Sequence, residues 1–104
     1  MTPQDCIDAL DRCASACTRC YSACIAERRL DEMEKCIRLD MDCASLCRLT
    51  SEALARDTQF MRDFCDLCAR LCDVCADECA RHPAQHCQDC SDACRRCAEA
   101  CRAL

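Results

Sequence analysis

Residues 65–79 read CDLCARLCDVCADEC, and residues 87–101 read CQDCSDACRRCAEAC. In both stretches the cysteines follow one another at steps of three, four, three and four residues. Such steps place every cysteine on one face of an α-helix, whereas a β-strand would require steps of two. The two stretches therefore predict two helices, each with a continuous stripe of thiols along one side.

The same spacing extends through the first half of the chain. Cysteines stand there at positions 6, 13, 17, 20 and 24, and again at 36, 43 and 47, so that every step is three, four or seven residues. We therefore predict four helices, at residues 3–28, 32–55, 58–81 and 84–102. Short connections make neighbouring helices antiparallel. The expected architecture is all-α, a single domain over residues 1–104 that forms an up-down-up-down antiparallel four-helix bundle with a cysteine-lined core.

Residue types that commonly begin helices stand close to the predicted helix starts. Residues 2–5 (TPQD) offer a capping threonine, a first-turn proline and an early acid. Residues 31–34 are typical of a capping box for the second helix. Asp57 or Thr58 can cap the third helix, and Pro83 suits the first position of the fourth.

Composition restricts the kind of core that the chain can build. The 104 residues include 18 cysteines and no glycine, and Leu, Ile, Val and Phe together number only 15. So low an aliphatic and phenyl content is typical of chains that cannot form an ordinary hydrocarbon core. Either the thiols fill the interior as small apolar groups, or they hold metal ions there. The absence of glycine excludes glycine-rich phosphate loops and EF-hand calcium sites.

Charge and hydropathy exclude two further classes of partner. A net charge of −5, with no Trp and three other aromatic residues, provides neither a basic surface nor stacking platforms for nucleic acid. No apolar stretch is long enough to span a bilayer, so we expect no membrane partner. No charged segment followed by an apolar run precedes the first predicted helix. We therefore expect a cytoplasmic protein with reduced thiols, unless a signal peptide has been removed.

The cysteine spacing also indicates which metal the thiols hold. Two cysteines four residues apart on a helix can place their sulfurs on either side of one ion, a geometry that suits soft Cu(I), and the chain holds seven such separate pairs. One Cu(I) per thiolate is neutral, whereas four Zn(II) sites of four thiolates each would bury a charge of about −8. The pattern therefore favours multiple Cu(I) ions and disfavours zinc. The spacings typical of iron–sulfur clusters do not occur.

All 18 cysteines are predicted metal ligands: Cys6, Cys13, Cys17, Cys20, Cys24, Cys36, Cys43, Cys47, Cys65, Cys68, Cys72, Cys75, Cys79, Cys87, Cys90, Cys94, Cys97 and Cys101. Four other residues are candidate ligands. His82 and His86 either line a mouth and hand metal inward or are solvated loop histidines. Asp40 falls on the cysteine face, where it is either a polar ligand or rotates outward. Met33 is either a thioether ligand at the same rim or a packing residue.

Because alternate helices reverse direction, the two ends of the bundle differ. One end gathers an apolar plug, consisting of Cys6, Ile7, Leu10, Leu54, Phe60, Met61, Phe64 and Leu104. The other gathers possible metal ligands, namely Cys24, Met33, Cys36, Cys79, His82, His86 and Cys87. We therefore expect a closed end and an open, metal-binding end.

A second apolar row runs along the second and third predicted helices: Leu39, Leu46, Leu49, Phe60, Phe64, Leu67, Leu71 and Val74. The first and fourth helices carry alanines at the corresponding places, and small residues there permit close helix approach. The larger side chains either pack between the second and third helices or form an oligomer contact. We favour the oligomer.

Four cysteine-lined helices, repeated Cys-x2-Cys-x3-Cys steps and histidines near the last loop resemble the bacterial copper storage proteins, in their cytosolic branch. The likeness spans nearly the whole chain. It implies a four-helix bundle that binds many Cu(I) ions, assembles into a homo-oligomer (a tetramer in that family) and admits copper through an open end with non-cysteine ligands. On this chain the copper ligands would be the 18 cysteines, and the mouth ligands His82 and His86, with Asp40 and Met33 as further candidates.

We therefore predict a cytosolic Cu(I) storage and detoxification protein, not an enzyme, that binds about one ion per thiol. Its partners would be copper ions and a copper donor or acceptor. Two other functions are weighed against this one: a general thiolate buffer for zinc or similar ions, and a structural bundle held by disulfides.

Overall fold

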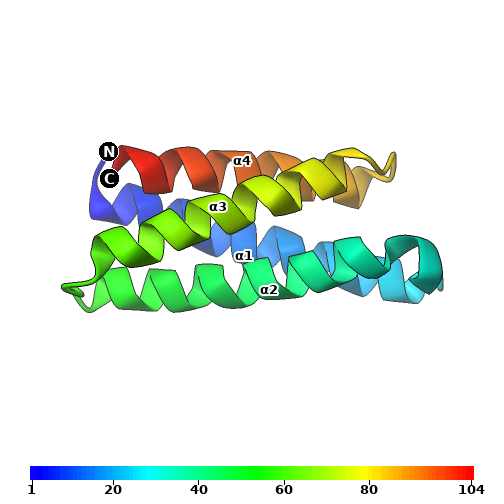
Figure 1. Cartoon of the computed structure of the whole chain (residues 1–104), viewed down its shortest axis with the longest axis horizontal. Helices are drawn as coiled ribbons and strands as arrows, with labels where there is room; N and C mark the ends of the chain where they lie inside the picture. Colours follow the sequence, from blue (N-terminus) through cyan, green and yellow to red (C-terminus); the bar gives the residue numbers. More distant parts are fainter.

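Four long helices run lengthwise beside one another in the computed structural model, which describes all 104 residues (Figure 1). They are α1 (Pro3–Ala26), α2 (Leu30–Ala55), α3 (Met61–Ala80) and α4 (Gln85–Ala103). Each helix packs against the next in sequence, and α1 also packs against α4, so the four form a closed ring around one axis. Both chain termini lie at the same end, and the bundle measures 41 × 18 × 17 Å. The predicted all-α up-down-up-down bundle is confirmed.

The start of α1 follows the predicted capping chemistry. The backbone N–H of Asp5 donates to Thr2 Oγ1 at 3.1 Å, and the backbone N–H of Thr2 donates to Asp5 Oδ2 at 3.0 Å. This reciprocal pair satisfies two N–H groups that the first turn of a helix leaves without partners. Pro3 lies at the first helical position, where no backbone donor is needed.

The turn between α1 and α2 has the predicted length but lies two residues earlier in the chain than predicted. α1 ends at Ala26 rather than at residue 28, because Arg28 takes a left-handed backbone conformation with φ of 59° that reverses the chain. α2 then begins at Leu30, and its N-cap, Arg29, makes no side-chain capping bond. The predicted capping box at residues 31–34 is therefore wrong, because those residues already lie inside the helix.

The starts of α3 and α4 also differ from the prediction. Thr58 accepts a hydrogen bond from the backbone N–H of Phe60 at 3.1 Å, but this stabilises a turn, and α3 begins only at Met61. Asp57 caps nothing, since it has a φ of 59° in the turn after α2. Pro83 lies outside α4, because Ala84 at the N-cap is extended.

The closed end is built from fewer side chains than predicted. Leu10 is fully buried, Leu54 is nearly so, and Ile7, Met61 and Leu104 pack against the same core. Phe60, by contrast, is 54% exposed, because it lies in the turn before α3 rather than on its inner face. The apolar plug is therefore confirmed without Phe60 and without Phe64, which is partly exposed and lines a groove on the outer surface.

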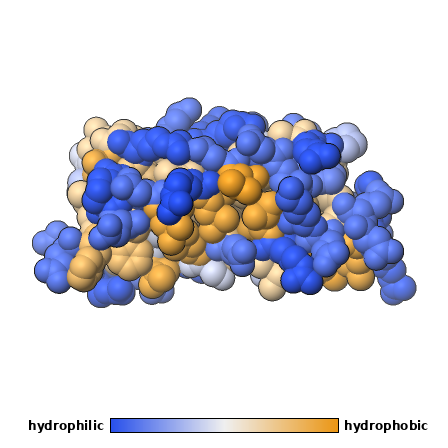
Figure 2. All heavy atoms as spheres, in the orientation of Figure 1, coloured by the Kyte–Doolittle hydropathy of each residue, from blue (hydrophilic) through white to orange (hydrophobic).

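The second apolar row lies on the outside of α2 and α3. Leu49, Phe60, Leu67 and Val74 are each about half exposed, and a surface groove of about 330 Å³ is lined chiefly by side chains of this row. Figure 2 shows apolar side chains gathered over these two helices. Leu39, Leu46 and Leu71 of the row pack against the core, whereas the four exposed members are available for an external contact.

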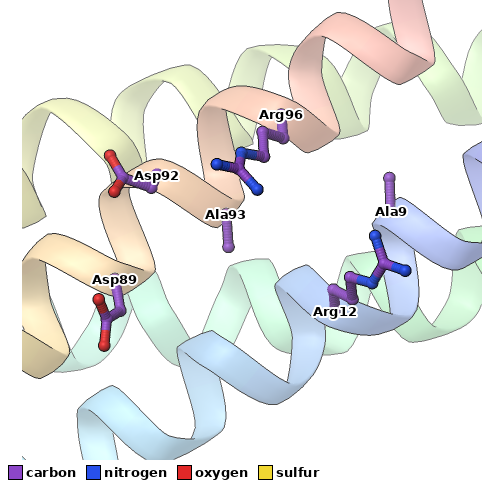
Figure 3. A pocket seen from close by; sticks show the side chains of 6 residues that line it. All are labelled: Ala9, Arg12, Asp89, Asp92, Ala93 and Arg96. Carbon is purple, nitrogen blue, oxygen red and sulfur yellow. The ribbon is translucent and has the colours of Figure 1, made fainter.

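The opposite pair of helices is separated by a shallow hollow. Ala9 of α1 and Ala93 of α4 turn their methyl groups into it, while the charged side chains of Arg12, Asp89 and Arg96 stand around it (Figure 3). Its volume is about 260 Å³. The alanines of this side line a hollow between α1 and α4, and a close approach of these two helices stays a prediction. No helix in the bundle has both the length and the apolar character needed for a membrane crossing.

Candidate metal centre

The interior of the bundle is a column of thiols. All 18 cysteines have no exposed surface, and none forms a disulfide. The column follows from the sequence spacing, since steps of three and four residues keep every cysteine on the side of its helix that faces the bundle axis. The alternative of a bundle held by disulfides finds no support in this arrangement.

Sulfurs from all four helices meet at the middle of the column. Cys43 Sγ of α2 lies 3.9 Å from Cys13 Sγ of α1, 3.6 Å from Cys72 Sγ of α3 and 3.9 Å from Cys94 Sγ of α4. These atoms come from positions up to 81 residues apart in the chain, as the 3.6 Å contact between Cys13 and Cys94 shows. The predicted convergence of thiols on a shared axis is confirmed.

Contacts between helices outnumber those within the predicted pairs. Sulfurs four residues apart approach to 3.9 Å for Cys43 and Cys47 and to 4.0 Å for Cys68 and Cys72. Closer approaches join different helices, for example 3.6 Å between Cys47 and Cys68. Two cysteines on one helix therefore do not form a complete site by themselves, because their sulfurs also lie close to sulfurs of other helices.

The sulfurs form overlapping groups of four, each with its ligand atoms within 4.8 Å of one another. Three of these groups consist of cysteines alone: Cys13, Cys47, Cys72 and Cys97; Cys13, Cys17, Cys43 and Cys94; and Cys17, Cys75, Cys90 and Cys94. Because neighbouring groups share members, a thiolate can bridge two ions. Soft sulfur ligands select Cu(I), zinc or iron–sulfur clusters, and the charge of a fully buried column favours the monovalent ion.

Asp40 is the one carboxyl group inside the column. It is fully buried, so the alternative in which it rotates outward is wrong. Its Oδ1 accepts hydrogen bonds from the thiols of Cys75 at 3.2 Å and of Cys79 and Cys90 at 3.3 Å. Burial raises the pKa of Asp40 from its ordinary 3.8 to about 8, because a charged carboxylate loses its hydration there. Asp40 also belongs to a possible metal-binding group with Cys20, Cys79 and Cys90.

His86 lies at the open end of the column, next to its last thiols. Its Nδ1 lies 3.4 Å from Cys20 Sγ and 3.5 Å from Cys87 Sγ, and these residues form a possible metal-binding group with Cys24. Burial is the main cause that raises the pKa of Cys24 to about 12 and that of Cys87 to about 11. These thiols are therefore protonated at neutral pH until a metal displaces the proton. The Nε2 of His86 lies 3.1 Å from the carboxylate of Glu27.

His82 and Met33 occupy the same end but have different surroundings. His82 Nε2 lies 2.8 Å from Glu78 Oε2, and the structure gives His82 no hydrogen bond to a thiol. The Glu78 carboxylate is nearly buried and also lies 3.7 Å from Lys35 Nζ. Met33 is buried and packs within the apolar core cluster. The structure thus brings His86 to the thiols and leaves His82 beside them.

Sequence reasoning missed two acidic residues of this end, Glu27 and Glu78. Glu78 precedes His82 by four residues on one helix, a spacing from which the contact could have been found. Glu27 and His86 are 59 residues apart, and no pattern in the sequence connects them.

Comparison with known proteins agrees with this arrangement. The family model described as copper storage protein matches residues 1–104. The Cu(I)-bound copper storage protein BsCsp3 is 42% identical, with 97% of this chain and 95% of that chain covered and a TM-score of 0.94. A cytosolic copper storage protein from Streptomyces lividans, solved with five coppers, is 43% identical, with 97% of this chain and 89% of that chain covered and a TM-score of 0.93.

A further relative is known from its sequence. The uncharacterized cysteine-rich protein YhjQ of Bacillus subtilis (strain 168) is 42% identical over 64 residues, which are 62% of this chain. The matched region spans 59% of that protein's own length. A family match over every residue, together with two structures of more than 40% identity that share the fold, settles the assignment. The chain belongs to the copper storage protein family.

Proposed function

We propose that the chain stores and detoxifies copper in the cytosol, by holding Cu(I) ions in the thiolate column at close to one ion per cysteine. One observation carries this proposal: all 18 cysteines are fully buried without a disulfide, and sulfurs from all four helices contact one another in the middle of the bundle. The related copper-bound structures, one of them loaded with 10 copper equivalents, support it. Burial keeps bound ions away from water and slows their release unless a competing ligand is present.

The structure supports entry at the end formed by Cys24, Cys87 and His86. The opposite end is closed by Leu10 and Leu54, whose apolar side chains offer no ligand. An ion bound at the entrance can pass to the group that contains Asp40 and from there to the cysteines of the middle. Asp40 and His86 are therefore proposed ligands of the entry path. His82 is proposed to attract copper from the rim, and a thioether role for Met33 stays a prediction.

Metal uptake requires each thiol to lose its proton. The thiols of Cys24 and Cys87 hold theirs at neutral pH, so every Cu(I) bound by a thiol should release about one proton. The resulting Cu(I)–thiolate units are neutral, which lets them accumulate in a buried column without mutual repulsion. We propose no catalytic role for this site.

An anaerobic Cu(I) titration followed by native mass spectrometry tests the proposal. Saturation near 18 ions per chain is the expected result, since the chain has 18 cysteines. Saturation at four or five ions would overturn it. A parallel titration with Zn(II), followed by competition with Cu(I), distinguishes the general thiolate buffer: zinc should be displaced completely. Thiol counting after an acid quench of freshly isolated protein checks that the cysteines are reduced in the cell.

We also propose that the chain forms a homo-oligomer through the apolar face of α2 and α3. Leu49, Leu67 and Val74 are each about half exposed on the same face, which also carries the apolar groove. A contiguous patch of large apolar side chains on a protein surface commonly marks an interaction site. Burying these side chains against a second copy would remove them from water. Light scattering coupled to size-exclusion chromatography measures the number of chains directly. A copper donor or acceptor is a further proposed partner, and copper transfer between purified proteins would identify it.

A further inference from the structure

A carboxylate and a histidine that are 59 residues apart in the sequence meet at the open end of the thiol column. Glu27 is the C-cap residue that follows α1, and its backbone N–H donates to the carbonyl oxygens of Ala23 and Ile25. Its side chain reaches across to α4, and both carboxylate oxygens lie 3.1–3.2 Å from His86 Nε2. The left-handed turn at Arg28 follows directly and ends the helix at this place. Glu27 is therefore held beside His86 by the backbone as well as by its own contact.

The contact decides which ring nitrogen of His86 carries the proton. A carboxylate has no hydrogen to donate, so the hydrogen bond requires Nε2 to be the donor. A neutral imidazole then has a free lone pair on Nδ1, and that atom faces the thiols of Cys20 and Cys87. The nitrogen that can bind a metal is thus the one that points into the column.

We propose that Glu27 is a positioning residue for copper capture, which holds His86 in the Nε2–H form so that Nδ1 completes an entry site with Cys20, Cys24 and Cys87. The proposal rests on the copper storage function proposed above. In metal sites generally, a carboxylate that accepts the second N–H of a ligating histidine fixes the orientation of the ring and raises its basicity. Removal of such a partner commonly lowers metal affinity about 10- to 100-fold.

The second histidine of this end provides an internal contrast. His82 also pairs with a carboxylate through Nε2, but that carboxylate belongs to Glu78, which is shared with Lys35 and Arg81. His82 makes no hydrogen bond to a thiol, whereas His86 Nδ1 approaches two. The same pairing therefore has different consequences. At His86 it orients a possible metal ligand, whereas at His82 it is part of a group of charged contacts around Glu78.

The test begins with the copper-free protein, so that its first readout does not depend on metal. Long-range proton–nitrogen NMR spectra of the wild type, Glu27→Gln and Glu27→Ala identify the protonated ring nitrogen of His86. We expect the Nε2–H form to predominate in the wild type and to decline in Glu27→Ala, with Glu27→Gln intermediate because its amide oxygen still accepts a hydrogen bond. Glu32→Gln is the matched control, since it removes one exposed acidic charge near the same end without touching His86.

Stopped-flow measurement of Cu(I) uptake at limiting copper provides the second readout. The first ion should be captured about 10-fold more slowly in Glu27→Ala, with total capacity unchanged and with Glu32→Gln equal to the wild type. A wild type that holds the proton on Nδ1, or a Glu27→Ala variant with unchanged tautomer and capture rate, overturns the positioning role while copper storage stands. A wild type that binds no Cu(I) overturns the storage function and the positioning role together.

Discussion

The buried carboxyl group of Asp40 should make the copper-free bundle less stable as the pH rises. The change that tests this is Asp40→Asn, which keeps the size of the side chain and removes its ability to ionise. In the wild type, burial raises the pKa of Asp40 from 3.8 to about 8. The native state therefore keeps a proton that the unfolded chain releases at every pH between these two values.

The sign and the size of the effect follow from proton linkage. Because the native state binds more protons than the unfolded state, the free energy of unfolding falls as the pH increases, by about 1.36 kcal/mol per pH unit for one proton. Between pH 5 and pH 7 the wild type should lose roughly 2 to 3 kcal/mol from this group. The group is fully buried, so screening by water does not reduce this figure.

Urea unfolding of the reduced, copper-free protein at pH 5 and pH 7 measures the difference. Asp40→Asn should remove most of the loss, whatever its absolute stability, so a general weakening of the fold would not imitate the result. Asp42→Asn is the control, because Asp42 lies exposed on the same helix two residues away, and this variant should lose stability as the wild type does. If Asp40→Asn loses as much stability as the wild type, Asp40 is not the group that couples the fold to pH.

Three other predictions concern the mouth, the closed end and the outer face. Replacing His86 with Ala should slow Cu(I) uptake more than replacing His82 with Ala, with most of the capacity kept in both, because only His86 faces thiols; equal effects in stopped-flow loading would contradict this. Leu10→Ala should destabilise the copper-free protein by about 2–5 kcal/mol in urea unfolding, because it opens a cavity in the apolar plug. Leu30→Ala, at an exposed position, should change stability by less than about 0.5 kcal/mol. Leu67→Asp should reduce the number of chains per particle in light scattering, since it places a charge in the proposed contact face, and an unchanged mass would exclude this face as the interface.

The helices and their inward faces could be read from the sequence because both depend on local periodicity. Cysteines at steps of three and four residues specify a helix and its buried side at the same time, and all 18 are buried as predicted. The helix ends were less predictable. The start of α2 was misassigned because the left-handed turn at Arg28 has no glycine to mark it.

The chemistry of the open end was decided by the tertiary structure. The sequence predicted that His82 and His86 belong near one end and that Asp40 lies on the cysteine face, but it could not show that His86 turns Nδ1 toward two thiols while His82 turns to Glu78. Nor could it show that the carboxylate of Glu27, 59 residues from His86, lies at hydrogen-bond distance from His86 Nε2. The physical reason is that periodicity determines which face of a helix is buried, whereas the partner of a side chain depends on how separate helices are aligned along a common axis and on where their turns place the chain.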